Sequence, residues 1–320
     1  MVDIKIALIL PYFGKLPNYF NLYLLSCKFN PQIDWLLLTD DKTIYNYPNN
    51  VKVIYVTFNE IQERIKKKFD FPISILYPNK LCDYRPAYGY IFEELITGYD
   101  FWGYCDSDCI WGDLSKFITQ DILKIYDKIF TLGHLTLFKN TKSINQIFQL
   151  SLNKRERYKD VFQTKYGCAF DEQNKQSIND IFETTDYQFY KVNCCADIDP
   201  YHQNFRLSIY DQNKRVYFLE NTKKQVFVWE KGILLKIYKN NKNVITEEFG
   251  YIHLQKRKME DYTNNTTNEF LIIPNQFISV ENREYSLLLE KYYIQYFFNF
   301  QFIKVKWNSL KFRINKIKCL

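Results

Sequence analysis

The sequence predicts an α/β fold built on a mostly parallel sheet with an antiparallel extension. Three short apolar runs carry this prediction: residues 5–10, 35–39 and 51–56. Each run ends at polar or turn-forming residues, and helix-compatible stretches lie between the runs or after them. Such an alternation of strands and helices is typical of βαβ units, whose strands run parallel.

The first strand and its connection are expected near the N-terminus. The apolar run 5–10 is closed by Pro11 and followed by Gly14, which is typical of a buried strand that ends in a loop. The segment 19–29 is expected to form the crossover helix that leads to the next strand.

The second and third strands end in a similar way. The run 35–39 stops at Asp40, and the run 51–56 precedes a charged stretch, 59–69, with helical periodicity. In parallel sheets, ligands bind beyond the carboxyl ends of the strands. Polar clusters follow three of the expected strands and are candidates for ligand contacts: 12–15, 40–41 and 106–108.

The second half of the chain has a different pattern. From about residue 180 to residue 256, short strand-like runs alternate with turns, which predicts an antiparallel extension of the sheet. Residues 257–269 form a polar linker, and an aromatic, basic tail that is expected to be helical follows. We therefore predict a main domain, 1–260, and a linker with a C-terminal tail, 261–320.

The charge of the protein is concentrated in the tail. The net charge is +7, and the chain after Glu290 carries seven basic residues and no acidic one, so residues 1–290 are formally neutral. This neutrality argues against a nucleic-acid-binding protein. The aromatic and basic tail fits either an anionic membrane surface or a helix that packs on the domain.

The cysteines and the hydropathy predict a cytoplasmic protein. The eight cysteines form no C-x-x-C pair, which argues against a zinc knuckle. No apolar stretch approaches the length of about 18 residues that spans a bilayer, and the first residues do not resemble a secretory signal. We expect reduced thiols in the cytoplasm, with a peripheral position on the inner face of the plasma membrane if the tail binds lipid.

Asp106 and Asp108 are the strongest chemical feature. They follow the apolar residues 101–105, and side chains at i and i+2 of an extended backbone lie on the same side. Neighbouring carboxylates repel each other unless a cation lies near them. Mg²⁺ and Mn²⁺ prefer carboxylate oxygen and often share their ligand shell with phosphates. The pair indicates a divalent metal site; a capped turn at a strand end is the alternative.

His253 and Lys256 form a second feature. His253 ends a short apolar strand, 249–253, and is a candidate for a further ligand of the same cation. Lys256, three residues later, is a candidate phosphate contact. The alternative is a surface histidine beside a solvated basic face.

Lys80, Asp83 and Arg85 form a third feature, just before an expected helix at 88–95. Clustered charges at a helix start suit a ligand with phosphate and hydroxyl groups. A helix-capping salt bridge is the alternative.

Asp171 and Glu172 form a fourth feature. A carboxylate at this position could deprotonate an acceptor hydroxyl group, provided that the fold brings it to the reacting carbon. The alternative is an acidic pair that only starts a helix.

Taken together, these segments resemble a family of bacterial GT-A type glycosyltransferase-like proteins of polysaccharide and capsule biosynthesis. The resemblance covers roughly residues 1–260 and implies a GT-A, Rossmann-like fold, a Mn²⁺ or Mg²⁺ ion and a UDP-sugar donor. The segments that carry it are KLCDYRPAYGYIF (80–92), FWGYCDSDCIWGDL (101–114), GHLTLFKN (133–140), AFDE (169–172) and FGYIHLQKRKM (249–259).

The resemblance also implies roles for individual residues. Asp106 would face the ribose or sugar of the donor and, with Asp108 and His253, would belong to the metal site. Lys256 would contact the phosphates. The remaining donor contacts would be Pro11, Tyr12 and Asp40 around the nucleoside, and Lys80, Asp83 and Arg85 along the donor pocket.

The function implied is the transfer of a sugar, with galactose and galactofuranose among the candidates, to a glycan or lipid-linked acceptor. If the enzyme inverts the anomeric centre, Asp171 or Glu172 would be the base. The stereochemistry stays open, because the chain lacks the Lys-Pro-Trp ending that some retaining galactosyltransferases carry after the histidine. A catalytically silent nucleotide-sugar or glycan-binding protein and a DxD phosphatase are the alternatives.

Overall fold

The computed structural model describes most of the chain, which forms two compact units. The first unit consists of residues 1–107 and 115–193, and the second of residues 108–114 and 194–320. The described residues are 4–172, 175–222, 224–241, 243–255, 257–263, 268–281 and 284–292, together with 303, 306, 307 and 310.

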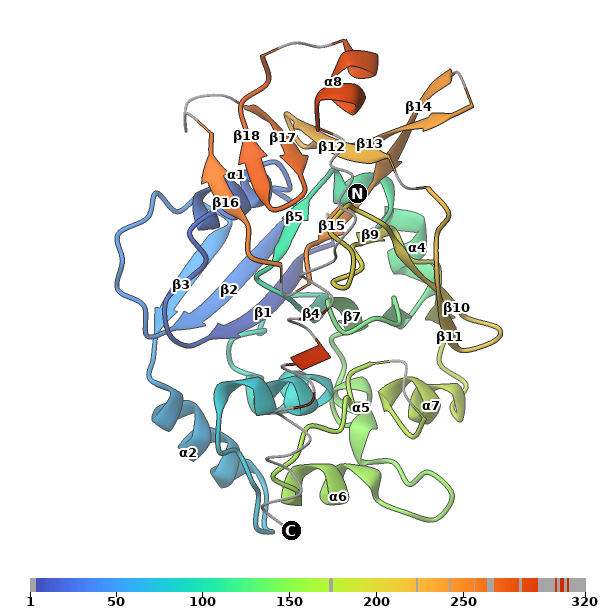
Figure 1. Ribbon diagram of the computed structural model, residues 1–320. Helices are drawn as coiled ribbons and strands as arrows, with labels where there is room; N and C mark the ends of the chain where they lie inside the picture. Colours follow the sequence, from blue (N-terminus) through green and yellow to red (C-terminus); the bar gives the residue numbers. More distant parts are fainter. Residues whose placement is uncertain are drawn as a thin grey trace. The chain divides into compact units, whose positions relative to one another are not determined.

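The first unit is built on a mixed sheet whose central strands run parallel (Figure 1). In spatial order its strands are β3 (Val51–Tyr55), β2 (Ile33–Thr39), β1 (Ile6–Tyr12), β4 (Phe101–Cys105), β7 (Leu135–Lys139), β6 (Lys128–Ile129) and β8 (Phe189–Tyr190). Strands β3, β2, β1 and β4 are parallel, and β7 is antiparallel to both β4 and β6. The predicted α/β class, with a mostly parallel sheet and antiparallel strands added to it, is confirmed.

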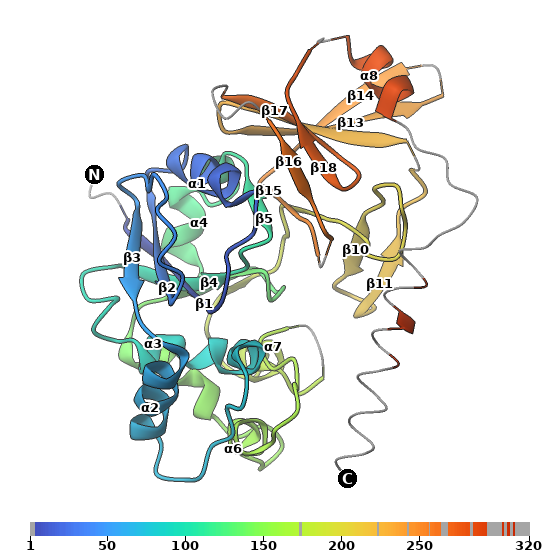
Figure 2. The same cartoon turned by 60° about the vertical axis from the view of Figure 1, so that its left-hand side comes forward.

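The central strands are covered on both faces. Residues 6–10 of β1 and 35–39 of β2 are all buried, which explains why their sequences are continuous apolar runs. Helix α1 (Phe20–Lys28) lies on one face of the sheet, and α2 (Phe58–Lys68) and α6 (Arg157–Gln163) lie on the other (Figures 1 and 2).

The helices of this unit agree with the sequence pattern where the pattern is strong. Helix α2 begins with a capping box, in which the Thr57 hydroxyl accepts the Glu60 N–H group and the Glu60 carboxylate accepts that of Thr57. The helix expected at 88–95 ends at Ile91, and turns follow it. The other helical elements include η1, a 3₁₀ helix (Pro78–Ala87), α3 (Tyr88–Ile91), α4 (Gln120–Ile125), α5 (Lys142–Asn145), η3, a second 3₁₀ helix (Ile147–Gln149), and α7 (Ile178–Glu183).

Aromatic side chains fill much of the core on the α2 face. Tyr84 stacks on Phe162 with ring centroids 4.1 Å apart, and Trp102 stacks on Phe138 at 4.8 Å. The indole N–H group of Trp102 donates to Asn145 Oδ1 at 2.6 Å, so its polar atom is satisfied inside the protein. Stacked rings of this kind contribute beyond the area that they bury.

We expect Gly103→Ala to destabilise the protein by about 1–3 kcal/mol. A Cβ atom at this position of β4 would lie 2.2 Å from the backbone oxygen of Thr136, in the neighbouring strand β7, and a backbone atom in a sheet cannot easily move aside. Gly167→Ala is the matched control, because a Cβ atom there meets nothing within 4 Å. Urea denaturation measures the effect, and equal midpoints for the two variants would contradict the prediction.

The second unit consists mainly of antiparallel strands. Its larger sheet has the order β14 (Asn243–Phe249), β13 (Ile233–Asn240), β12 (Gln225–Glu230), β17 (Glu269–Ile273), β18 (Gln276–Ile278) and β16 (Glu260–Tyr262). Helix α8 (Tyr285–Tyr292) packs on this sheet through Leu288 and Leu289. The smaller sheets are β5 (Cys109–Trp111), β15 (Tyr251–His253) and β9 (Cys195–Asp197), and the pair β10 (Ser208–Asp211) and β11 (Val216–Leu219).

The second unit differs from the sequence pattern in two ways. Strands β12 to β14 belong to a separate six-stranded sheet, together with β16 to β18, instead of extending the parallel sheet. Residues 260–278, expected as a linker and the start of the tail, contain three strands, because residues 270–273 are apolar and are buried in the larger sheet. The expected aromatic tail segment, 293–302, lies outside the described residues. In the described part of the chain, no helix is both long enough and apolar enough to cross a membrane.

Candidate functional site

Hydrogen bonds tie together two loops at the carboxyl edge of the parallel strands. Pro11 and Tyr12 end β1, and Tyr12 lies opposite Thr39 of β2. Asp40 follows β2, and its Oδ1 atom accepts the N–H group of Gly14 at 2.7 Å. The structure thus brings Pro11, Tyr12 and Asp40, for which the sequence predicts nucleoside contacts, to one edge of the sheet.

The buried side chain of Asp41 also joins these two loops. Its side chain is buried and accepts the Thr43 hydroxyl at 2.6 Å and the Leu16 N–H group at 3.0 Å. These hydrogen bonds, that from Thr43 first, keep the pKa of Asp41 below its ordinary value. Asp41 therefore stabilises the loops in its charged form, while Asp40 is the exposed carboxylate.

Arg85 links two of the predicted acidic residues within the first unit. Its Nη1 atom donates to Asp171 Oδ2 and to the backbone oxygen of Gly133, both at 2.9 Å, and its Nη2 atom pairs with Asp106. The guanidinium carbon lies 5.5 Å from the centre of the Tyr104 ring. Since only 11% of the Arg85 side chain is exposed, this cation is a nearly buried counter-ion for both carboxylates.

Gly133 permits the close approach of the acidic loop. A Cβ atom at this position would lie 2.9 Å from Glu172 Cγ and 3.0 Å from Asp171 Oδ2. The loop that carries both acids therefore packs directly on the backbone at Gly133. Glu172 is half-buried there, whereas Asp171 is fully buried.

Burial changes the acidity of Asp171. Its second oxygen, Oδ1, is buried and accepts no hydrogen bond from the residues that the structure describes. Burial raises the pKa of Asp171 to about 7, against the opposing effect of the Arg85 charge. A carboxyl group with this pKa can exchange a proton near neutral pH, as an acid–base residue must.

The same shift predicts a pH dependence of stability. The carboxyl group of Asp171 loses its proton near pH 4 in the unfolded chain and near pH 7 in the folded protein. Between these values the folded state holds the extra proton, so this residue makes the protein less stable as the pH rises through the window. Asp171→Asn is expected to remove that part of the pH dependence.

The measurement is the urea midpoint of both proteins at pH 5 and pH 7.5. Asp186→Asn is the control, because Asp186 is exposed in the same unit. If the wild type and Asp171→Asn change equally with pH, the assignment of the shift to Asp171 is wrong.

Lys80 and Asp83 form a buried ion pair. The ammonium group of Lys80 donates to Asp83 Oδ2 at 2.7 Å and to the backbone oxygens of Val161 and Tyr166 at 2.9 and 2.7 Å. An ammonium group has three N–H bonds, so each has an acceptor within the protein. Asp83 also accepts the N–H group of Cys168 at 2.9 Å. The pair thus holds the segment that leads to the acidic loop, and the donor contacts predicted for these residues stay a prediction.

In the second unit, strand pairing places Asp108 beside His253. His253 lies opposite Cys109, the first residue of β5. The N–H group of Leu254 donates to the backbone oxygen of Asp108 at 2.9 Å. His253 Nε2 lies 3.4 Å from Asp108 Oδ1. Two of the three predicted metal ligands, far apart in the sequence, are therefore neighbours in this unit.

Asp197 belongs to the same cluster, and the sequence analysis missed it. Its Oδ1 atom lies 2.8 Å from His253 Nδ1 and accepts the Gln255 side-chain amide at 2.7 Å. A carboxylate on one ring nitrogen fixes the orientation of the imidazole and directs the other nitrogen outward. An acidic residue at the end of the short run Cys195–Asp197 was the available signal. Its relation to His253 follows from the parallel register of β9 and β15.

The two carboxylates determine the charge of the histidine. Burial disfavours the charged imidazole, but Asp108 and Asp197 outweigh this effect and raise the pKa of His253 well above its ordinary value. In the protein without a bound metal, the charged imidazolium therefore offsets part of the negative charge of the two acids.

The other predicted residues are distributed as follows. The boundary between the two units falls after Ser107, so Asp106 belongs to the first unit and Asp108 to the second. Their carboxylates are partly exposed, at 27% and 31%. Lys256 lies outside the described residues.

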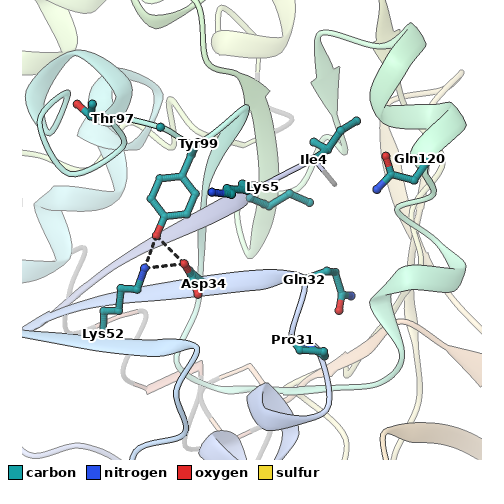
Figure 3. A pocket seen from close by; sticks show the side chains of 11 residues that line it. Ile4, Lys5, Pro31, Gln32, Asp34, Lys52, Thr97, Tyr99 and Gln120 are labelled. Atoms are coloured by element: carbon teal, nitrogen blue, oxygen red, sulfur yellow. Dashed lines mark hydrogen bonds and ion pairs between the residues drawn. The ribbon is translucent and has the colours of Figure 1, made fainter. Parts of the chain in front are cut away.

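A cavity of about 740 Å³ opens at the other edge of the parallel sheet (Figure 3). There, Asp34 Oδ2 accepts the Lys52 ammonium at 2.7 Å and the Tyr99 hydroxyl at 2.6 Å. The cavity lies at the amino-terminal ends of β1 and β2, and none of the predicted site residues lines it. These polar groups bind one another and are not part of the candidate site.

Several solved structures resemble the chain weakly. The galactosyltransferase LgtC, solved with donor and acceptor sugar analogues, is 15% identical over 60% of this chain and 75% of its own, with a TM-score of 0.34. GlyE, a glycosyltransferase of Streptococcus pneumoniae TIGR4, is 14% identical over 59% of this chain and 45% of its own, with a TM-score of 0.32. Mouse xyloside xylosyltransferase 1 is 7% identical over 62% of this chain and 88% of its own, with a TM-score of 0.33. At such scores the similarity says nothing about the chemistry of the site.

The sequence comparisons give a family without an assigned activity. No curated protein matches the chain. Residues 8–281 match the sequence model of a family of unknown function, DUF6625. Because the match covers most of the chain, the protein belongs to this family.

Proposed function

We propose that this protein is a metal-dependent glycosyltransferase of the GT-A type that uses a UDP-sugar as its donor. The observation that carries the proposal is the cluster of Asp108, His253 and Asp197 in the second unit. Histidine ligands of metal ions are commonly oriented by a carboxylate on the other ring nitrogen. Asp197 has this position here, and Asp108 lies on the side of Nε2. Two of these residues, Asp108 and His253, are also the ones for which the sequence predicts a shared cation.

The residues present fit a divalent ion. His253 Nδ1 is paired with Asp197, which leaves Nε2, on the side of Asp108, as the ligand atom. Carboxylate oxygen and imidazole nitrogen are ligands that Mn²⁺ accepts. We include Asp106 as the third ligand, because it lies two residues before Asp108 in the chain. When bound, the ion would stabilise the negative charge that develops on the leaving diphosphate.

Proton release accompanies metal binding in this proposal. A ligating imidazole must be neutral, whereas Asp108 and Asp197 favour the charged form of His253. The affinity for metal should therefore fall as the pH is lowered. This dependence is a readout that does not require the substrate.

The first unit would bind the rest of the donor. The loops after β1 and β2, which Asp40 joins to Gly14, are proposed to hold the nucleoside through Pro11, Tyr12 and Asp40. Lys256 is proposed to contact the diphosphate. Arg85 would keep Asp106 oriented through the ion pair between them.

The acidic loop would supply the proton acceptor if the reaction inverts the anomeric centre. Glu172 is half-buried and Asp171 is fully buried, so Glu172 is the more accessible candidate base. Asp171, paired with Arg85, would then position this loop. The acceptor is proposed to be a glycan or a lipid-linked sugar, as in the synthesis of bacterial surface polysaccharide.

The test is a thermal-shift screen of UDP-, GDP- and CMP-sugars, each with and without Mn²⁺. A ligand that binds the folded state at 100 times its Kd stabilises it by about 2.7 kcal/mol. We expect the largest shift from a UDP-sugar with Mn²⁺, and hydrolysis or transfer of the same sugar.

The outcomes separate the alternatives. A shift without turnover would indicate a catalytically silent nucleotide-sugar-binding protein. Release of phosphate from simple phosphate esters would indicate the DxD phosphatase. If no nucleotide-sugar shifts the melting temperature with Mn²⁺, the proposal is wrong.

A further inference from the structure

The hairpin formed by β10 and β11 exposes an unusual amount of apolar surface. Val216 and Phe218 are each 50% exposed, Tyr217 is 44% exposed, and Ile209 is 37% exposed. Scattered exposed apolar residues are common, but several large ones on one short element mark an interaction surface. The hairpin lies in the second unit and contains none of the residues of the candidate site.

The exposure is not that of a strand with one buried face. Side chains alternate between the two faces of a sheet, so a half-buried strand would bury every second residue. Here three consecutive residues of β11, Val216, Tyr217 and Phe218, are all exposed. Both faces of the two-stranded ribbon therefore meet solvent, and Figure 2 shows β10 and β11 as a ribbon separate from the larger sheet of this unit.

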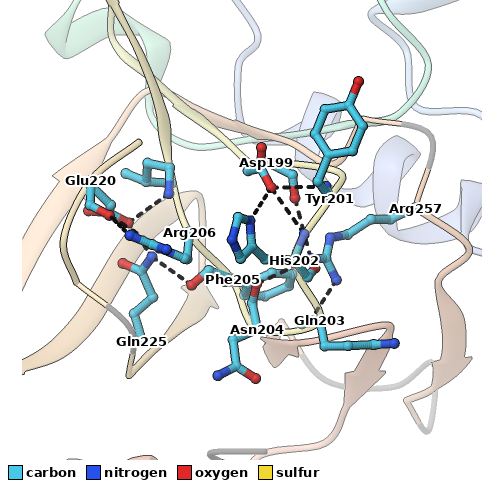
Figure 4. Close-up of polar contacts among 11 residues, drawn as sticks. Asp199, Tyr201, His202, Gln203, Asn204, Phe205, Arg206, Glu220, Gln225 and Arg257 are labelled. Carbon is cyan, nitrogen blue, oxygen red and sulfur yellow. Dashed lines mark hydrogen bonds and ion pairs between the residues drawn. The ribbon is translucent and has the colours of Figure 1, made fainter. Parts of the chain in front are cut away.

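Buried hydrogen bonds and an ion pair join the base of the hairpin to the rest of its unit. Glu220, directly after β11, is buried and accepts the N–H group of Leu207 at 2.7 Å and the Lys236 ammonium at 2.8 Å. Arg206 donates to the backbone oxygen of Glu220 at 2.6 Å, and Gln225 bonds to its carboxylate (Figure 4). An isolated hairpin is only marginally stable in water, so this buried network explains how an exposed hairpin keeps its shape.

The segment that enters the hairpin is fixed as well. Arg257 is 5% exposed, and its guanidinium donates to the backbone oxygen of Gln203 at 3.0 Å and to that of Asn204 at 3.2 Å (Figure 4). It also donates to the side chain of Asn275 at 3.0 Å, in the turn between β17 and β18 of the larger sheet. A buried cation thus ties this loop to the sheet of its own unit.

The turn of the hairpin adds positive charge to the apolar surface. Lys214 and Arg215 precede the exposed residues Val216 to Phe218, and both are exposed. Asp211, 3.7 Å from Lys214, is the one acidic residue of the hairpin, so its formal net charge is +1. Tyrosine, phenylalanine and basic side chains together match the boundary between lipid headgroups and acyl chains.

We propose that the β10–β11 hairpin inserts into the headgroup region of an anionic lipid membrane. A second copy of the chain fits less well, because a stable interface buries about 800 Å² per partner. Even if each of the four partly exposed side chains had the full area of an aromatic one, about 150–250 Å², the exposed half of each would supply only about half of that area in total. The inference does not depend on the proposed enzymatic activity, since it requires neither metal nor donor.

The test is co-sedimentation of the full chain with vesicles of phosphatidylcholine, with and without phosphatidylglycerol. We expect binding to the anionic vesicles, with weaker binding at high salt. The double variant Tyr217→Ser, Phe218→Ser is expected to lower the partition coefficient about tenfold or more, because it removes the inserted aromatic side chains. Lys214→Glu with Arg215→Glu is expected to have a similar effect through charge.

Matched controls lie in the first unit. Ile44→Ser removes an apolar side chain that is 96% exposed, and Lys66→Glu with Lys67→Glu makes the same charge change on helix α2. Both controls should bind vesicles as the wild type does. Thermal melting checks that each variant is folded. If the double serine variant of the hairpin does not fold, its double glutamate variant provides the test.

Three results would overturn the proposal. The first is that the wild-type protein binds neither kind of vesicle. If the hairpin variants bind vesicles as well as the wild type does, another segment, such as the basic tail, makes the lipid contact. A concentration-dependent dimer that only the hairpin variants lose would identify a second copy of the chain as the partner.

Discussion

His253→Ala is expected to lower metal-dependent turnover of a nucleotide-sugar by about 100-fold or more. The substitution removes the imidazole that lies 3.4 Å from Asp108 and 2.8 Å from Asp197, and it leaves these two carboxylates without the group between them. Kinetics over a Mn²⁺ titration measure the effect. Because a ligand is lost, the Mn²⁺ concentration for half-maximal activity should rise together with the loss of kcat.

Two further variants make this test specific. Asp197→Asn keeps the imidazole but weakens its orientation, so we expect a loss of about 10–100-fold. His202→Ala is the matched control, because His202 Nδ1 pairs with Asp199 at 2.6 Å in the same unit and has no part in the proposed site. Equal activities of the His253 and His202 variants would contradict the assignment of His253 as a ligand.

Lys80→Met is expected to lower the free energy of unfolding by about 3–5 kcal/mol. Lys80 and Asp83 are each 1% exposed, so removing the ammonium leaves a buried carboxylate without its counter-ion. The backbone oxygens of Val161 and Tyr166 lose a donor at the same time. Urea denaturation at neutral pH measures the change.

The control is an ion pair of nearly the same length on the surface. Lys66 lies 2.8 Å from Glu63, with both side chains about half exposed. Lys66→Met should change stability by about 0–1 kcal/mol, because water replaces the lost partner. If both methionine variants unfold at the same urea concentration, the buried pair does not have the stabilising role inferred from its contacts.

Local sequence signals were sufficient to predict many of the strands and helices of the first unit. The runs that became β1 and β2 are apolar throughout because helices cover both faces of their sheet. Helix α2 lies within one residue of the expected 59–69, since helical periodicity and a capping box agree there. Strands β6 and β8 have two residues each, and so short a segment has no periodicity to detect.

The strands of the second unit were harder to predict, because they are defined more by tertiary pairing than by local sequence. The apolar run 270–273 has the same local pattern as many buried segments, and only its pairing with β12 and β18 identifies it as a strand of the larger sheet. The structure therefore differs from the expected linker, 257–269, at β16, and from the expected start of the tail at β17 and β18.

The candidate site could be predicted only where its residues stand out in the sequence. Asp108 and His253 end or begin short apolar runs, and their proximity in the second unit agrees with the prediction that they act together. Asp197 was missed because its partner is distant in the sequence and is reached only through strand pairing. Lys80 and Asp83 were expected to face a ligand, and a sequence cannot show that backbone oxygens already surround the ammonium.

The parallel pairing of β9 with β15 limits where the length of this chain can change. A shift of one residue in a strand turns every side chain to the opposite face, so an insertion within Cys195–Asp197 would move the carboxylate away from His253 and turn Ala196 out of the core. The turn between β13 and β14, where Asn241 has a φ of 55°, can absorb such a change. Among members of the family, insertions and deletions should therefore gather in turns of this kind and spare the strands around the histidine.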